Sequence, residues 1–172
     1  MSTTRGAVPI VEFGSTSGWE RARLSGPRPH DPQWDRTVIG VRFANSFWRR
    51  QPDTSRTIEK DALVEFPQVI VTRKGLEQLA NALFMWEASL WPEADPYNLN
   101  AIDISTGTQS LTFAAGTTDK IRQLWQKVLE IAYKVPGSTS FVQQLILDTT
   151  ILDQAINELR SFLHQSLHWR PT

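Results

Sequence analysis

The sequence predicts an α+β fold in which an antiparallel sheet has two main helices packed on one face. Residues 72–90 and 150–167 carry apolar side chains at the three- and four-residue spacing of a helix. Shorter segments rich in β-branched and aromatic residues lie before and between them, separated by turn-forming residues. The chain has 172 residues, a length that suits one domain.

Residues 1–37 are predicted to form an N-terminal strand and an irregular arm, and residues 38–172 the single α+β domain. Residues 8–13 are typical of a short strand, whereas the residues that follow, up to Arg36 and Thr37, are rich in Gly, Ser, Pro and Arg. That composition favours a long surface connection. Trp19, Leu24 and Trp34 would pin the connection to the body, although a partly mobile arm fits the same residues.

Strands and a helix are expected next. Residues 37–48 place Ile39, Val41 and Phe43 on one side of a half-buried strand. Residues 58–71 predict one or two more strands, in which Pro67 marks a bulge, an edge or a break because it lacks an N–H donor. A helix capped by Thr72 and ended by Pro92 would then bury one apolar stripe. Its members are Leu76, Leu79, Ala80, Leu83, Trp86 and Leu90.

Residues 99–115 predict a hairpin that turns around Gly107. Residues 119–135 fit either a helix or a strand. We expect a short helical or irregular start and then a strand over residues 127–135, because the turn at 136–140 and the apolar segment 141–147 would complete a hairpin.

The last helix is predicted to begin at Thr150, with Asp153 three residues on as a variant of the capping box. Negative charge at Asp148 and Asp153 would also favour the N-terminal end of this helix. Its buried stripe is Leu152, Ala155, Ile156, Leu159, Phe162, Leu163 and Leu167.

Composition excludes several classes of protein. The chain has 18 basic and 18 acidic residues, and this balance argues against nucleic-acid binding. It has no cysteine, so disulfides and thiolate metal sites are impossible. No apolar run approaches the ~20 residues of a membrane span, and the N-terminus does not resemble a secretory signal. We therefore expect a cytoplasmic protein that binds neither nucleic acid nor membranes.

The common catalytic motifs do not occur in the sequence, among them the glycine-rich phosphate loops and the serine and zinc hydrolase signatures. His164 and His168 are four residues apart on the last helix, but two imidazoles make half a metal site. Asp103, Asp148 and Asp153 are better explained by structural roles than by acid–base catalysis. The sequence thus predicts no catalytic residues, no cofactor and no metal.

Two aromatic segments are candidates for binding another protein. Trp48, Arg49 and Arg50 follow a predicted strand, and Trp and Arg are enriched at the energetic centres of interfaces. For this segment we favour ordinary packing with solvated arginines, then a protein interface and then nucleic-acid binding. The second segment is acidic and would suit a basic partner. Its candidate residues are Trp91, Glu93, Asp95 and Tyr97.

The order of elements over residues 38–163 resembles that of the WapI-type immunity proteins of bacterial contact-dependent toxin systems. The closing pattern of that family is a strand, an Asp, a polar pair and a Leu-bearing helix. Here it stands as LILDTTILDQAINELRSFL, with Asp148 as the aspartate. The resemblance implies a non-enzymatic α+β protein that neutralises a cognate toxin by direct binding. We expect a monomer or homodimer, because edge strands beside Pro67 or at residues 8–13 could pair between chains. A secretion chaperone or a phage or assembly accessory protein is the alternative, and an enzyme would need Asp and His residues gathered in one pocket.

Overall fold

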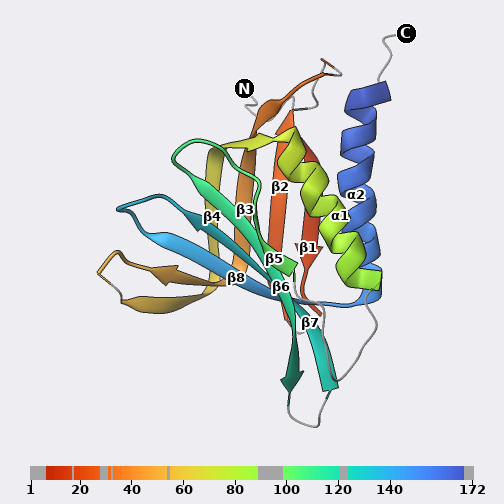
Figure 1. The fold of residues 1–172 in the computed structure, drawn as a ribbon. Coiled ribbons are helices and arrows are strands. Elements are labelled where there is room, and N and C mark those ends of the chain that lie inside the picture. Colours follow the sequence, from red (N-terminus) through yellow and green to blue (C-terminus); the bar gives the residue numbers. More distant parts are fainter. Residues whose placement is uncertain are drawn as a thin grey trace.

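The computed structural model describes residues 7–16, 18–27, 31, 33–53, 55–88, 99–120 and 124–168. It confirms the α+β class: an antiparallel sheet carries two helices on one face (Figure 1). The strands are β1 (Ala7–Gly14), β2 (Arg21–Pro27), β3 (Arg36–Arg50), β4 (Arg56–Thr72), β5 (Leu99–Asp103), β6 (Ser110–Lys120), β7 (Leu124–Lys134) and β8 (Ser140–Leu147). The helices are α1 (Arg73–Ala88) and α2 (Thr149–His168).

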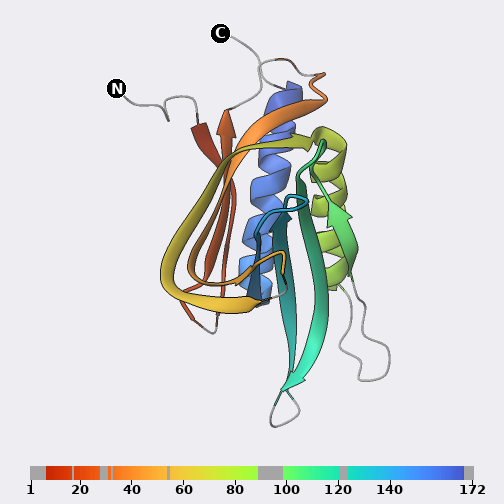
Figure 2. The ribbon, with the colours of Figure 1, turned by 90° about the vertical axis from the view of Figure 1, so that its left-hand side faces the viewer.

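The sheet consists of two meanders, each built from strands that are consecutive in the chain. Strands β1 to β4 pair in sequence order, and so do β5 to β8. The two meanders meet where Trp48–Arg50 of β3 pair with Ser140–Val142 of β8. Figure 2 shows the strong curl that results, and α1 and α2 pack side by side against the sheet.

A buried glutamine bridges the point where the meanders separate. The last pair of β2 with β3 is Arg21 with Ala44, and β8 joins β3 only from Trp48. Between these positions Gln143, which is fully buried, donates from Nε2 to the carbonyl oxygens of Ala44 (3.1 Å) and Ser46 (2.9 Å). These two bonds replace the ladder bonds that a neighbouring strand would supply there.

The buried stripes of both helices agree with the sequence. Thr72 caps α1 as expected, because its Oγ1 accepts the N–H of Gly75 at 2.9 Å. The cap of α2 differs: Asp148 Oδ1 accepts the N–H of Ile151 at 2.8 Å. The prediction of Thr150 was wrong because the helix begins at Thr149, which places Thr150 within its first turn. Side chains of Leu90 and Leu167 lie outside the described residues.

Two expectations about strands need correction. Residues 21–27 form β2 rather than part of an irregular connection, and Ala22, Leu24 and Gly26 alternate on its buried side. Ser25, Gly26 and Pro27 form the C-terminal end of this strand. The second correction concerns residues 119–126: the described ones extend β6 and β7, which pair as far as Lys120 with Leu124. Long hairpin pairing thus overrides the helical spacing of this segment.

Candidate protein-binding surface

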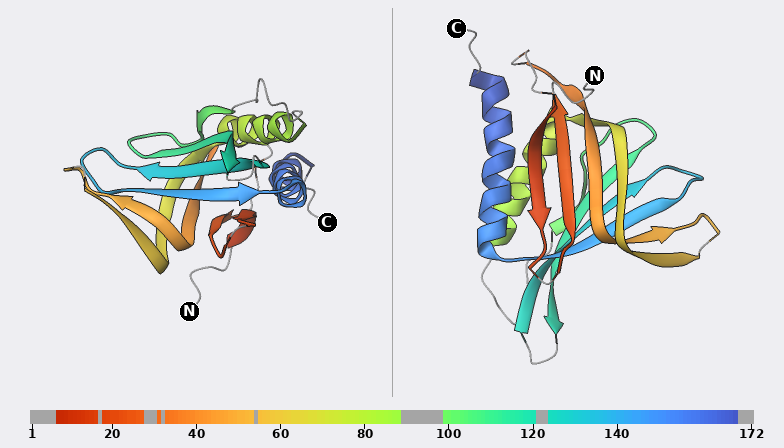
Figure 3. Two further views of the ribbon diagram at one scale, coloured as in Figure 1. Left: turned by 90° about the horizontal axis from the view of Figure 1, so that it is seen from below. Right: turned by 180° about the vertical axis from the view of Figure 1, so that it is seen from behind.

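The predicted cluster Trp48–Arg50 lies where β3 and β4 extend beyond the body as a hairpin, at the end away from α2 (Figure 3). Because side chains alternate along a strand, the three residues do not share one surface. Arg49 lies on the inner side of the sheet, which is the face that carries the buried side chain of Phe47. Its guanidinium is 5.4 Å from the centroid of the Phe141 ring, and its Nε is 3.7 Å from Glu59 Oε2. Trp48 and Arg50 lie on the outer side.

On that outer side Trp48 is held by residues from β4. The guanidinium carbon of Arg56 lies 4.0 Å from the centroid of the Trp48 ring, which is a close cation–π contact. Ile58 is the direct partner of Trp48 across the two strands, and Arg56 is the partner of Arg50. The indole is therefore fixed in place before any partner arrives.

The same side of β3 and β4 carries further exposed residues in register. Leu63 opposes Ala44, Glu65 opposes Arg42, and Ile70 opposes Val38. The exposed fractions of Val38, Ile58, Leu63 and Ile70 lie between 36% and 58%. We call this row the outer stripe. Its residues are Val38, Arg42, Trp48, Arg50, Arg56, Ile58, Leu63, Glu65 and Ile70.

A shallow groove of about 780 Å³ crosses β1 to β4 beside the part of the outer stripe that contains Val38, Arg42 and Glu65. Small residues, among them Ser25 and Gly40, leave this space. Pro67 stands at the bulge opposite Gly40, so of the three possibilities expected for Pro67 the bulge is the one observed. Arg23 and Arg42 oppose each other across β2 and β3, and Nε of Arg23 is buried without a hydrogen-bond partner among the described residues. Two arginines paired across neighbouring strands favour an approaching carboxylate.

Aromatic packing behind the hairpin keeps the outer stripe in position. Phe66 stacks on Tyr133 with ring centroids 3.9 Å apart, and Phe141 lies 5.0 Å from Phe66. Phe47 joins the same cluster through Phe141 at 6.1 Å. These contacts tie β3 and β4 to β7 and β8, so the hairpin is supported from its inner side.

The second predicted segment, with Trp91, Glu93, Asp95 and Tyr97, lies outside the described residues. Sequence reasoning also missed most of the outer stripe. Leu63 and Ile70 are distant from Trp48 in the chain, and only the register of β4 against β3 brings them together. The sequence signal that could have found these residues is the alternation of side chains along residues 58–71, which places every second one on the exposed side of β4.

The residues considered for catalysis or metal binding have structural partners. Asp103 Oδ1 accepts the N–H groups of Ser105 (2.9 Å) and Leu111 (3.2 Å), which fixes the turn between β5 and β6. Asp148 caps α2, as described above. Within the described residues, no cluster of three metal-binding side chains occurs, and no helix is long and apolar enough to cross a membrane. The side chain of His168 is outside the described part.

A buried lysine at the end of α1 was not anticipated. Lys127 of β7 is 7% exposed, and its Nζ donates to the carbonyl oxygens of Trp86 (2.6 Å) and Glu87 (3.1 Å). Burial lowers the pKa of Lys127, and the charge of Glu87 opposes this shift. Burial also raises the pKa of Glu87, as does a hydrogen bond with Asp153. The lysine thus satisfies carbonyl groups at the C-terminal end of the helix.

Comparison of the chain with protein-family models, with curated proteins and with solved structures gave no match.

Proposed function

We propose that this chain is a non-enzymatic protein-binding domain, acting in the cytoplasm as an immunity protein that neutralises a bacterial toxin by covering it. The outer stripe is the surface that would make the contact. The observation that carries the proposal is the row of exposed apolar side chains beside Trp48, whose ring is already oriented by Arg56. The resemblance of the element order to the WapI-type immunity proteins supports the choice of partner.

The chemistry of the outer stripe suits a protein partner. Trp and Arg provide large contact areas that can bury apolar atoms and still donate hydrogen bonds. Because paired strands and the inner aromatic cluster fix the stripe, binding would order few new groups and would lose little conformational entropy.

The charge of the outer stripe indicates what kind of protein surface it would bind. Arg42, Arg50 and Arg56 outnumber Glu65 on the outer stripe, and Arg23 lies beside it in the groove. This surface favours an acidic and apolar patch on the toxin. A toxin that presents an acidic surface fits better than a nuclease with a basic one.

The test is co-expression with the toxin domain encoded beside the gene, followed by measurement of growth rescue and of the dissociation constant. We expect Trp48→Ala to weaken binding at least about tenfold, which corresponds to about 1.4 kcal/mol. Leu63→Glu should have a similar effect without removing a packed ring.

Trp19→Ala is the matched control, because Trp19 is 78% exposed and lies outside the outer stripe. Equal losses for Trp19→Ala and Trp48→Ala would contradict the assignment of the surface. Failure of the wild-type chain to bind any adjacent toxin would contradict the immunity role, and binding to a secreted or phage protein instead would favour the accessory function.

A further inference from the structure

The shallow groove across β1 to β4 has a floor of small residues. Ser25 and Gly40 oppose each other across β2 and β3, and Pro67 lies at the bulge opposite Gly40. A Cβ added to Gly40 would have no heavy atom of another strand closer than 3.9 Å. The sheet at Gly40 is therefore open to an incoming group, and a larger residue at this position would fill the groove.

Charged residues lie along one side of this groove, in a row that crosses four strands. The row is Glu12, Arg23, Arg42 and Glu65, and each residue opposes the next in register. The two arginines at its centre are direct neighbours, and like charges in that position repel each other. The ion pairs among the described residues occur elsewhere, so neither carboxylate of the row is paired with an arginine.

Arg23 also has an unused hydrogen-bond donor. Its Nε is buried and has no partner among the described residues, whereas a buried donor normally has one. Because no bond fixes this guanidinium, it can turn toward a carboxylate that lies between the two arginines, and the donor then gains an acceptor. A local arrangement that costs stability without an evident structural gain is expected at a functional site.

The other side of the groove is apolar. Beyond Ser25 and Gly40, the next residues on the outer face of β2 and β3 are Pro27 and Val38, which line the groove. An occupant thus meets guanidinium groups on one side and apolar atoms on the other. Since successive side chains of an extended segment point to opposite sides, an acidic residue between two apolar ones fits this arrangement.

The ends of the charged row limit the number of carboxylates in the occupant. Strands lie about 4.8 Å apart, so the point midway between the arginines is about 7 Å from the strands of Glu12 and Glu65. Two residues of an extended chain span nearly the same distance, about 6.7 Å. A second acidic residue two positions from the first would therefore meet a like charge, and the occupant has a single carboxylate.

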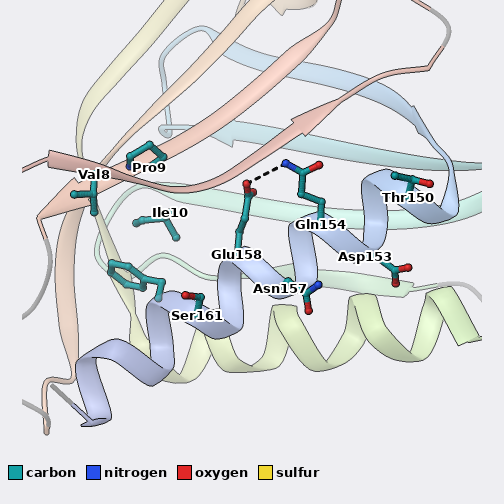
Figure 4. A pocket seen from close by; sticks show the side chains of 10 residues that line it. Val8, Pro9, Ile10, Thr150, Asp153, Gln154, Asn157, Glu158 and Ser161 are labelled. Atoms are coloured by element: carbon teal, nitrogen blue, oxygen red, sulfur yellow. Dashed lines mark hydrogen bonds between the residues drawn. The ribbon is translucent and has the colours of Figure 1, made fainter.

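The hollow between β1 and α2, of about 740 Å³, does not offer a comparable site. Oε1 of Glu158 accepts the N–H of Glu12 at 3.0 Å, and Oε2 accepts from Nε2 of Gln154 at 3.5 Å (Figure 4). The charged group of that hollow thus already has partners within the chain, whereas the arginines of the shallow groove have none among the described residues.

We propose that the shallow groove binds an extended segment of the partner in which one Asp or Glu lies between apolar residues. The segment crosses the face of β1 to β4 and does not add a strand to the sheet. Its carboxylate accepts hydrogen bonds from Arg23 and Arg42, and its apolar side chains contact Pro27 and Val38. This inference rests on the proposed function, because the groove adjoins the outer stripe, and it names the chemistry of the toxin segment.

The probe is the peptide acetyl-Thr-Val-Glu-Val-Thr-amide, titrated at low salt into ¹⁵N-labelled protein while the arginine Nε–H resonances are followed by NMR. We expect saturable binding below about 5 mM peptide, with the largest shifts at Arg23 and Arg42. Replacement of the glutamate by glutamine should weaken binding at least about tenfold. The more acidic peptide acetyl-Glu-Val-Glu-Val-Glu-amide should also bind more weakly, although a merely basic surface would bind it more tightly.

Two variants test the floor and the end of the row. Gly40→Val should weaken binding at least about tenfold without lowering the melting temperature, because the new side chain has space and valine favours strands. Glu65→Gln should strengthen binding of the three-glutamate peptide, because it removes one of the two repelling carboxylates. Glu77→Gln, which neutralises an exposed carboxylate on α1, is the matched control and should change neither affinity.

Three results would overturn the proposal: no saturable shift at Arg23 and Arg42, tighter binding of the three-glutamate peptide to the wild-type chain, or unchanged peptide binding by Gly40→Val. The peptide titration needs no toxin, so the groove and the immunity role can fail separately. Peptide binding without binding of any toxin would contradict the immunity role alone. Toxin binding that Gly40→Val leaves unchanged would contradict the groove alone.

Discussion

Gln143→Met tests whether a side chain replaces strand pairing at the separation of the two meanders. The substitution keeps the length of the side chain and removes its amide. It abolishes the hydrogen bonds to the carbonyl oxygens of Ala44 and Ser46. Each such bond contributes about 1 kcal/mol, and a carbonyl left without a partner adds to the loss.

One effect opposes this loss. Oε1 of Gln143 is buried without a hydrogen-bond partner among the described residues, and methionine removes that cost. We therefore expect the free energy of unfolding to fall by about 2 kcal/mol. In a domain of this size the melting temperature should fall by about 4–8 °C. Urea unfolding measures the free energy and thermal unfolding measures the melting temperature, each followed by circular dichroism and by tryptophan fluorescence.

Gln144→Met is the matched control, because Gln144 is the next residue on β8, is exposed, and bonds only Glu130 among the described residues. It should change stability by less than about 0.5 kcal/mol. If both variants unfolded at the same urea concentration, the bridging role of Gln143 would be refuted.

Three further substitutions probe the helices. Gly75→Ala should destabilise the fold by about 1–3 kcal/mol, because a Cβ there would lie 2.8 Å from Cα of Ile104; chemical unfolding beside Gln78→Ala, which faces solvent, measures the difference. Asp148→Ala should cost about 1 kcal/mol, while Thr150→Ala should cost less than half of that, and equal losses would contradict the observed cap. Glu87→Gln should alter the pH dependence of stability. Since burial raises the pKa of Glu87, its protonated form is favoured in the folded state, and this contribution is lost as the pH rises through the raised pKa. The variant should therefore gain stability relative to the parent between about pH 4.5 and neutrality, and parallel pH profiles would refute this.

The sequence was informative where one local pattern decided the structure. Several features follow from rules that act within a few residues. They are the stripe of α1 with its Thr72 cap, the turns at Gly107 and Gly137, and the bulge at Pro67. Strand β2 was missed because two of the three residues on its buried side, Ala22 and Gly26, are small and carry little hydrophobic signal. The start of β7 was missed because the apolar residues of this segment fit two periods equally well.

The candidate surfaces depend on pairings between distant parts of the chain. Trp48 was identified from its residue type, but its partners Arg56 and Ile58 come from β4 through the register. The contact between β1 and α2 brings the two ends of the described chain together, and no local pattern predicts it. Lys127 likewise meets Trp86 and Glu87 only in the folded chain.

The arrangement of the strands as two meanders has a consequence for dividing the polypeptide. Every strand pair of the first meander, and α1, lies before residue 89, and every strand pair of the second, with α2, lies after residue 98. The halves meet through the short β3–β8 pairing, the contacts of α2 with α1 and β1, and side chains that cross between them, such as Gln143 and the aromatic cluster around Phe66. A chain cut between residues 88 and 99 keeps all local pairings within its two fragments. Mixing the fragments should therefore restore the native circular dichroism spectrum, and this complementation would make the protein a usable split reporter.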